Sequence, residues 1–369
     1  MKLTLQMKLL PSNEQANSLL TTLKEANIVC NQISETIWKE KVFNQFKVQH
    51  LVYHPLKKTT RLSAQMLIRC ISKVVDAYKK DKKTKRKFKP LGAITYDIRI
   101  LSYNIEKQII SIWSVDGRLK IPFVCHNPKY LPYIKGEADL VYKKGKFFLF
   151  QTVEVPEDDV KDVEEFIGVD FGVNKIATLS DGTQYGSEQL DKVRNRYFKT
   201  RKSLQSKGTP GSRKCLKRLK GREKRHASVT NHTISKRIVE KAKTESKGIA
   251  IEDLTYIRER TKVRKAQRRR HHSWAFAQLR SFLEYKSKLA GIPLAVVDPH
   301  YTSQICNVCK MIGNRKGSSF SCPNCGNADA DVNAAKNIAQ LGALCKQPRK
   351  DVSMLNFVSH IPLKAPSNL

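Results

Sequence analysis

Acidic side chains are scarce in this sequence of 369 residues, which holds 33 Asp and Glu against 69 Lys and Arg. The formal net charge is therefore +36. Self-repulsion on this scale is difficult to explain without a polyanionic partner, and nucleic acid is the usual one. A membrane surface is the weaker alternative.

Long hydrophobic runs are also missing. No apolar segment approaches the roughly 18–20 residues of a membrane-spanning helix. The opening "MKLTLQMKLLPSNEQ" alternates polar and apolar residues and does not form the apolar core of a secretory signal. We therefore expect a cytoplasmic protein, and the length favours two or three domains.

Cysteines are few and odd in number, nine in all, which suits a reducing compartment and excludes a complete set of internal disulfides. Four of them form two CxxC pairs, Cys306/Cys309 and Cys322/Cys325, separated by 12 residues. This spacing lets four thiolates close one tetrahedron around Zn²⁺, with the segment between the pairs forming a ribbon hairpin. Because all four ligands come from the protein, the predicted zinc site is structural; four free cysteines are the alternative. The remaining cysteines read as packing residues: Cys30, Cys70, Cys125, Cys215 and Cys345.

Two kinds of periodicity divide the N-terminal half. Residues 1–9 alternate as a half-buried strand does, and Ser12 with Gln15 reads as a capping box that opens a helix near 13–40. A second amphipathic helix is predicted over 61–80, followed by a basic run at 79–89. Two hairpins then turn at Asp116-Gly117 and around Gly145, so the opening strand and residues 90–155 are predicted to form one β domain with the helices inserted into it.

From residue 166 the pattern becomes α/β. The predicted order is three strands, a basic helical region over 187–245, a buried strand at 248–254, a helix from Ser273 to Gly291, a strand at 293–298, and a helix from 331. This is the order expected of an RNase H-like fold. Residues 344–369 show no clear pattern and are expected to be a C-terminal tail that can be disordered.

Three carboxylates stand where structural acids are unusual. Asp170 ends an apolar strand, Glu252 lies within the buried stretch "GIAIEDL", and Asp331 opens a helix directly after the cysteine module. Taken singly, each has a structural interpretation: a turn Asp, a Glu paired with Arg, and a helix N-cap.

Taken together, the three point to a metal centre. They are 82 and 79 residues apart, so only a fold can bring them together. In an RNase H-like sheet they would converge and repel one another unless divalent cations neutralised them. Mg²⁺ prefers such oxygen ligands, and two ions about 4 Å apart would activate a water and stabilise the leaving 3′ oxygen of a phosphodiester.

The basic segments are strongly biased in sign. Residues 192–226 hold 15 Lys and Arg against the single acid Glu223, and residues 258–270 hold eight against Glu259. A solvent-exposed helix normally carries charges of both signs, so contact with phosphates is the favoured interpretation of these segments. Aromatic residues in or near these segments can stack on unpaired bases or pack between helices: Tyr197, Phe198, His226 (an imidazole) and Tyr256.

These sequences resemble a known family. "GVDFGVNKIATLSDG", "IAIEDL" and "VDPHYTSQICNVCK…CPNCG…DADVNAAKNI" are similar to the three RuvC-like motifs and zinc ribbon of TnpB, the RNA-guided endonuclease of bacterial insertion sequences, related to type V CRISPR effectors. "SWAFAQLRSFLEYKSKLAGIPLAVVDP" and the opening "LQMKLLPSNEQ" are also similar to that family. The resemblance runs from residue 1 to about 340.

The resemblance implies a layout and a set of site residues. It implies a wedge-like β-barrel domain at 1–10 and 90–160, a helical recognition lobe at 11–89, a RuvC-like nuclease domain at 166–303 and 328–343, a zinc ribbon at 304–327, and a tail at 344–369. It implies Asp170, Glu252 and Asp331 as catalytic ligands of two Mg²⁺ ions, and Cys306, Cys309, Cys322 and Cys325 as ligands of one structural Zn²⁺. Asp329 and Asp331 would face the same side of an extended segment; the family pattern places the ligand directly before x-Asn-Ala-Ala, which selects Asp331.

The function that follows is RNA-guided cleavage of DNA. The expected partners are a guide RNA from the transposon end and double-stranded target DNA with a short flanking motif, with base pairing reading the target; a monomer is favoured. Two other functions compete with it: a nuclease-inactive RNA-guided repressor, which the presence of all three carboxylates disfavours, and a transposase that performs strand transfer.

Overall fold

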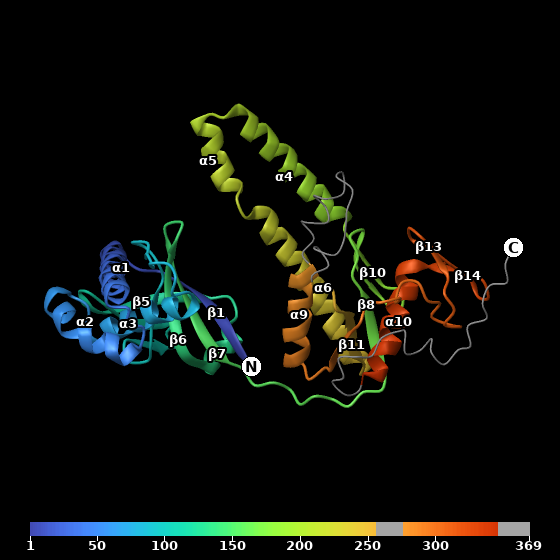
Figure 1. Ribbon diagram of the computed structural model, residues 1–369, viewed down its shortest axis with the longest axis horizontal. Helices are drawn as coiled ribbons and strands as arrows, with labels where there is room; N and C mark the ends of the chain where they lie inside the picture. The colour runs from blue at the N-terminus through green and yellow to red at the C-terminus, as the bar shows by residue number, and fades with distance from the viewer. Residues whose placement is uncertain (256–275, 346–369) are drawn as a thin grey trace. The chain divides into compact units, whose positions relative to one another are not determined.

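The computed structural model describes residues 1–255 and 276–345 (Figure 1). Several sequence predictions fall outside these ranges: the basic run at 258–270, Tyr256, the start of the helix at Ser273, and the tail beyond 345. The chain separates into two compact units, Met1–Pro156 (the N-terminal unit) and Glu157–Leu369 (the C-terminal unit). Among the described helices, none combines the length and the apolar character needed to cross a lipid bilayer.

The N-terminal unit is built on a seven-stranded antiparallel sheet in the order β2-β6-β7-β1-β5-β4-β3. Its strands are β1 (Lys2–Leu9), β2 (Ile94–Tyr96), β3 (Leu101–Asn104), β4 (Ile109–Ser114), β5 (Gly117–Cys125), β6 (Ile134–Lys143) and β7 (Lys146–Glu154), with a 3-10 helix at Pro128–Tyr133. Side chains tie each edge strand to a strand in the opposite half of the sheet: Tyr96 of β2 donates to the carbonyl of Trp113 of β4 at 3.0 Å, and Tyr103 of β3 donates to Gln151 of β7 at 2.6 Å. The sheet is therefore nearly closed.

Local signals predicted most of this unit correctly. Both hairpins form at the expected turns, where Gly117, Lys144 and Gly145 adopt positive φ. The capping box is present, with Ser12 and Gln15 each bonding the backbone of the other at the start of α1 (Asn13–Glu40). The predicted 61–80 helix is α3 (Ala64–Lys80).

Two elements of the N-terminal unit were not predicted. Helix α2 (Gln45–Thr59) contains Pro55, a residue that ordinarily argues against a helix interior. Tertiary packing of Val48 and Val52, both buried, offsets that cost. The stretch expected to give one hairpin contains a second, in which β3 pairs with β4 around residues 105–108.

The C-terminal unit is a five-stranded sheet covered by helices on both faces, in the order β10-β9-β8-β11-β12. Its elements are β8 (Phe166–Asp170), β9 (Lys175–Leu179), β10 (Gln184–Gly186), α4 (Glu188–Lys207), α5 (Pro210–Leu219), α6 (Arg222–Glu245), β11 (Gly248–Glu252), α9 (Phe276–Leu289), β12 (Leu294–Val297) and α10 (Ala330–Leu344). Strands β8, β11 and β12 are parallel, whereas β9 and β10 run antiparallel to their neighbours. The predicted sequence of elements is therefore present.

Alternation along the central strands assigns each face of the sheet. Ile249 and Ile251 of β11 belong to the core that also contains side chains of α6 and α9, whereas Ala250 belongs to the core that contains Ile338 and Leu341 of α10. Since successive side chains of a strand point to opposite faces, Glu252 lies on the α10 face with Ala250. This face carries the candidate site.

Helix α10 packs unusually close to β8. A Cβ built on Gly168 would lie 1.9 Å from the carbonyl oxygen of Ala335 and 2.5 Å from the amide nitrogen of Ala339, both backbone atoms of α10. A Cβ on Gly342 would lie 2.5 Å from the Cβ of Ala250. Glycine at 168 thus sets the distance between helix and sheet.

We expect Gly168→Ala to destabilise the C-terminal unit by the upper end of the ~1–3 kcal/mol that overpacking costs, because backbone atoms cannot rotate away as a side chain can. Urea denaturation followed by circular dichroism measures the loss. Gly211→Ala is the matched control, since nothing lies within 4 Å of its Cβ position in α5. An unchanged urea midpoint for Gly168→Ala would show that α10 does not pack against β8 at this distance.

A three-stranded ribbon precedes α10. Its strands are β13 (Asn314–Lys316), β14 (Ser319–Cys322) and β15 (Gly326–Asp329), in the order β13-β14-β15. Phe320 and Ala330 pack with Cys306 and Cys322 in a small core. The ribbon thus leads directly into the helix that carries Asp331.

Candidate metal-binding and catalytic site

Asp170 and Glu252 lie at the carboxyl ends of adjacent parallel strands. Strand β8 pairs with β11 so that Gly168 faces Ala250 and Val169 faces Ile251. Asp170 and Glu252 are the next residues of their strands, and both share the face of Gly168 and Ala250. Side chains that meet this way at the end of a parallel sheet occupy the usual position of a functional site.

Asp331 approaches from the helix above that face. It lies in the first turn of α10, four residues before Ala335, so the two share one side of the helix. The carbonyl oxygen of Ala335 is the atom nearest to a Cβ built on Gly168. The first turn of α10 therefore lies over the end of β8, where Asp170 emerges.

The electrostatics of the three carboxylates are coupled. Burial raises the pKa of Asp170 well above its ordinary value, and the charge of Asp331 raises it further. Burial likewise raises the pKa of Glu252, followed by the charge of Asp170. No hydrogen bond or ion pair holds the Asp170 carboxylate within the described ranges. The site thus concentrates acidic groups that the described residues only partly compensate.

The partial compensation comes from two cations. Arg315, on β13 of the ribbon, donates to Asp331 at 2.7 Å, and Lys175 at the start of β9 lies 3.5 Å from the same carboxylate. Both are charges that lower the pKa of Asp170. The ribbon therefore contributes a residue to the carboxylate site itself.

Asp329 has a different role from its neighbour. It is the N-cap of α10, accepting from the backbone N–H groups of Asp331 and Val332 at 3.0 Å each, and it pairs with Lys175 at 2.9 Å. The helix N-cap interpretation weighed for Asp331 is thus wrong, because the helix begins one residue earlier and Asp329 caps it. The two aspartates also do not share an extended segment, since β15 ends at Asp329.

Glu252 is held by a buried hydroxyl. Thr302 donates to its Oε1 at 2.5 Å, and Thr302 itself is 1% exposed. The carbonyl of Thr302 accepts from Asn337 of α10 at 2.9 Å, and Asn337 also bonds the carbonyl of Ile305. Asn333 bonds Ile305 and the backbone N–H of Asn307. One helix therefore fixes both the partner of Glu252 and the loop that carries Cys306.

The four predicted cysteines form a compact cluster. The sulfur atoms of Cys306, Cys309, Cys322 and Cys325 all lie within 4.8 Å of one another. Tetrahedral Zn²⁺ with bonds of about 2.3 Å places its sulfur ligands about 3.8 Å apart, which this cluster can satisfy. Burial opposes ionisation of Cys306, yet hydrogen bonds from the backbone N–H groups of Cys309 and Val308 lower its pKa to about 7. The donor set fits a structural zinc ion.

The carboxylates fit a different ion. Burial and mutual repulsion disfavour ionised carboxylates, and a bound divalent cation would offset both effects. Hard cations such as Mg²⁺ usually take carboxylate oxygens as ligands. Across residues 1–255 and 276–345 the cysteine cluster alone brings three or more ligand atoms within 4.8 Å of one another, so the carboxylate oxygens are farther apart than the cysteine sulfurs. Arg315 and Lys175 form ion pairs with Asp331.

Sequence reasoning missed Lys175, Thr302 and Arg315. Lys175 and Thr302 stand within stretches already singled out, but nothing local indicated that their side chains would reach Asp329 and Glu252.

Of the five single cysteines, Cys30 and Cys70 are buried as expected, whereas Cys215 is exposed, so its interpretation as a packing residue is wrong.

Comparison with known proteins supports the resemblance. Residues 276–338 match the family described as the Cas12f1-like TNB domain. The chain is 32% identical over 219 residues to the CRISPR-associated endodeoxyribonuclease Cas12f1 of Sulfoacidibacillus thermotolerans, covering 53% of this chain and 50% of that protein. It is 29% identical over 264 residues to a TnpB-like protein of Methanocaldococcus jannaschii, covering 68% of this chain and 87% of that protein.

One further sequence relative is of the same kind, and one solved structure is reported beside it. InsQ of Escherichia coli K12, provisionally named an RNA-guided DNA endonuclease, is 29% identical over 221 residues, which is 54% of each chain. Among solved structures, a Cas12f1–sgRNA–target DNA complex superposes with a TM-score of 0.40 and 18% identity, covering 92% of this chain and 99% of that one. The chain thus resembles TnpB-like and Cas12f proteins, and it spans about half the length of several of the curated relatives it matches.

Proposed function

We propose that this TnpB-like chain is an RNA-guided DNA endonuclease that hydrolyses phosphodiester bonds at Asp170, Glu252 and Asp331. The observation that carries the proposal is the electrostatic coupling of these carboxylates. They are remote in the chain but lie at the carboxyl ends of β8 and β11 and in the first turn of α10. The charge of Asp331 adds to burial in raising the pKa of Asp170, and the charge of Asp170 adds to burial in raising the pKa of Glu252. A purely structural set of acids would be paired with bases throughout, whereas Asp170 has no hydrogen bond or ion pair to its side chain among residues 1–255 and 276–345.

Asp170, Glu252 and Asp331 are the residues that would hold Mg²⁺. When bound, two such ions activate a water and stabilise the leaving 3′ oxygen. Glu252 is oriented for this task by Thr302. Lys175 and Arg315 hold Asp331 and supply positive charge beside the position where a phosphate would approach.

The basic helices α4, α5 and α6 are proposed to hold nucleic acid through its backbone. They contain the segment of residues 192–226, in which Glu223 is the single acid, and most of its Lys and Arg side chains are exposed. Charge of one sign on exposed helices favours contact with phosphates rather than with solvent alone. Base pairing to a guide RNA, not these side chains, would then read the target.

We propose the following domain assignment. Residues 1–10 and 90–160 form a wedge-like β domain and 11–89 a helical recognition lobe; 166–303 and 328–343 form an RNase H-like, RuvC-like nuclease domain with a zinc ribbon at 304–327. The nearly closed sheet with α1, α2 and α3 inserted after β1 supports the first pair. The strand order β10-β9-β8-β11-β12 and the ribbon before α10 support the second.

The direct test combines purified protein, its co-purifying RNA and Mg²⁺ with plasmids that match or mismatch that RNA. Linearisation of the matched plasmid alone supports the proposal. Tight binding without cutting would instead indicate an RNA-guided repressor, and joined strands a transposase. Sequencing the co-purifying RNA supplies the matched target.

Thr302 should act as a positioning residue. We expect Thr302→Val to lower kcat by about tenfold, the effect of losing a hydrogen bond to a charged group of roughly 1.5 kcal/mol. KM for target DNA should be unchanged, because Thr302 is buried against Glu252. Thr302→Ser keeps the hydroxyl and should retain activity. A Thr302→Val enzyme with unaltered kcat and an altered KM would contradict this role.

A further inference from the structure

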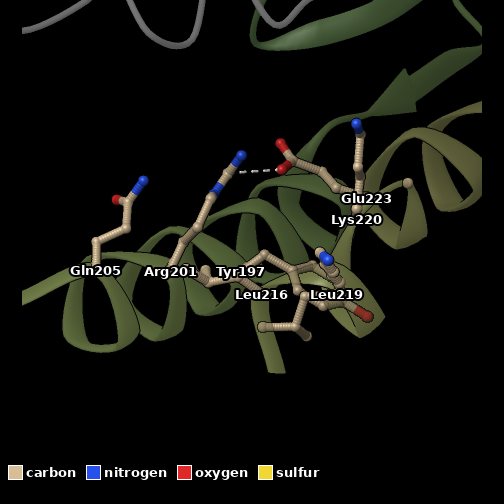
Figure 2. A pocket seen from close by; sticks show the side chains of 9 residues that line it. Tyr197, Arg201, Gln205, Leu216, Leu219, Lys220 and Glu223 are labelled. Carbon is tan, nitrogen blue, oxygen red and sulfur yellow. Dashed lines mark hydrogen bonds and ion pairs between the residues drawn. The ribbon is translucent and has the colours of Figure 1, made fainter. Parts of the chain in front are cut away.

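A pocket lies in the helical hairpin of the C-terminal unit, away from the carboxylates. It has a volume of about 350 Å³ and is lined by the second half of α4, the end of α5 and the turn into α6 (Figure 2). This volume is within the roughly 300–1,000 Å³ of small-ligand sites. Figure 1 shows α4 and α5 as the two arms of a hairpin that returns to the sheet through α6.

One side of the pocket is apolar and aromatic. Leu216 and Leu219 of α5 and the ring of Tyr197 from α4 line it, and all three side chains are only partly buried. Arg196 places its guanidinium 5.8 Å from the centre of the Tyr197 ring. An aromatic ring beside a cation is the combination on which proteins stack unpaired bases.

The other side of the pocket is polar and positive. Lys217 and Lys220 line it, and both are exposed. Arg201 also lines it, paired at 2.9 Å with Glu223, as the dashed line in Figure 2 marks. That pairing neutralises the single acid of residues 192–226, so Lys217 and Lys220 leave the pocket lining with a net positive charge. A flat apolar group with a phosphate attached fits such a lining.

We propose that this pocket takes one unpaired nucleobase of a bound polynucleotide strand, with the base against Tyr197, Leu216 and Leu219 and the adjoining phosphate at Lys217 and Lys220. The inference rests on the proposed function only in that the chain binds nucleic acid. Stacking of this kind tolerates any base, so the pocket would hold a strand at a fixed position without reading its sequence.

Helix packing alone is the competing explanation for Tyr197. It accounts for a partly buried ring between α4 and α5. It does not account for a cavity of this size left open beside the ring, or for lysines on its rim. The two explanations differ in whether a base contributes to binding.

The test compares two fluorescent 20-mers, oligo(dT) and an abasic strand with the same phosphate backbone. Full-length protein freed of RNA is titrated with each strand in EDTA, at several salt concentrations, and binding is read by anisotropy. Wild-type protein should prefer oligo(dT), and Tyr197→Ala should lower that preference about tenfold while leaving abasic affinity and its salt dependence intact. Unchanged abasic binding also shows that the variant is folded.

Matched variants separate stacking from charge. Tyr197→Phe should retain the preference for oligo(dT). Phe198→Ala removes the neighbouring aromatic ring, which does not line the pocket, and should also retain it. Lys214→Ala, on α5 but outside the pocket, should weaken both strands equally.

Equal weakening of both strands by Tyr197→Ala, or no effect on either, would overturn the pocket assignment while leaving the endonuclease proposal standing. Absence of any binding by wild-type protein would instead overturn the proposed function. Guide-dependent plasmid cleavage by wild-type protein, measured in parallel, distinguishes the two failures.

Discussion

Asp170→Ala is expected to abolish guide-dependent DNA cleavage while leaving RNA and DNA binding intact. Asp170 ends β8 beside Glu252 and is coupled electrostatically to Asp331. Metal ligands contribute several kcal/mol to stabilising the charge of a phosphoryl transition state, so the rate should fall on the order of a thousandfold or more. Single-turnover cleavage of a matched plasmid measures the rate, and electrophoretic mobility shift measures binding.

Stability distinguishes a catalytic Asp170 from a structural one. Burial and the charge of Asp331 disfavour its ionised form, so removing the carboxylate should not lower the thermal midpoint in EDTA. In wild-type protein Mg²⁺ should raise that midpoint, and in the variant it should not. Glu240→Ala, an exposed carboxylate of α6, is the control and should cut normally. Wild-type cutting by Asp170→Ala would refute the assignment.

Cys322→Ser is expected to lower zinc content and to destabilise the C-terminal unit. Structural zinc in small peptides binds with apparent free energies of about 10–16 kcal/mol, and a serine hydroxyl is a poor replacement for a thiolate. Because the ribbon supplies Arg315 to Asp331 and continues into α10, its loss should also reduce cleavage. Elemental analysis per chain and thermal denaturation measure the two effects.

The exposed Cys215 of α5 offers a matched control. Cys215→Ser should keep the zinc content and thermal midpoint of wild-type protein, and chelation should lower the midpoint of both. Unchanged zinc in Cys322→Ser would show that the four sulfur atoms are not the ligands, whatever their separation.

Elements specified by short-range chemistry were predicted correctly from the sequence. The helix at 13–40 has its cap within three residues, and the hairpins have their turns at Asp116-Gly117 and Gly145. Helix α2 was missed because its stability comes from buried Val48 and Val52, not from its own propensity. Its Pro55 argues locally for the opposite conclusion.

Some residues of the candidate site could likewise be predicted from the sequence, and others could not. Asp170 and Glu252 could be singled out because an acid at the end of an apolar strand is conspicuous in the sequence. Thr302 and Arg315 could not, since a threonine or an arginine in a loop or ribbon is ordinary. Their contacts span 50 and 16 residues of chain. That Asp329 and not Asp331 caps α10 likewise depended on where the helix begins.

The sequence by itself determined the charge of +36, the two CxxC pairs, the apolar strands β8 and β11 and the order of elements in the C-terminal unit. The charge follows from composition alone, and the others depend on residues within a few positions of one another, where backbone geometry leaves few choices. Only the tertiary structure decided that α10 lies against Gly168, that Asp331 is held by Arg315 and Lys175, and that Tyr197 lines a pocket. These depend on contacts between remote segments, whose geometry is fixed by packing and not by local sequence.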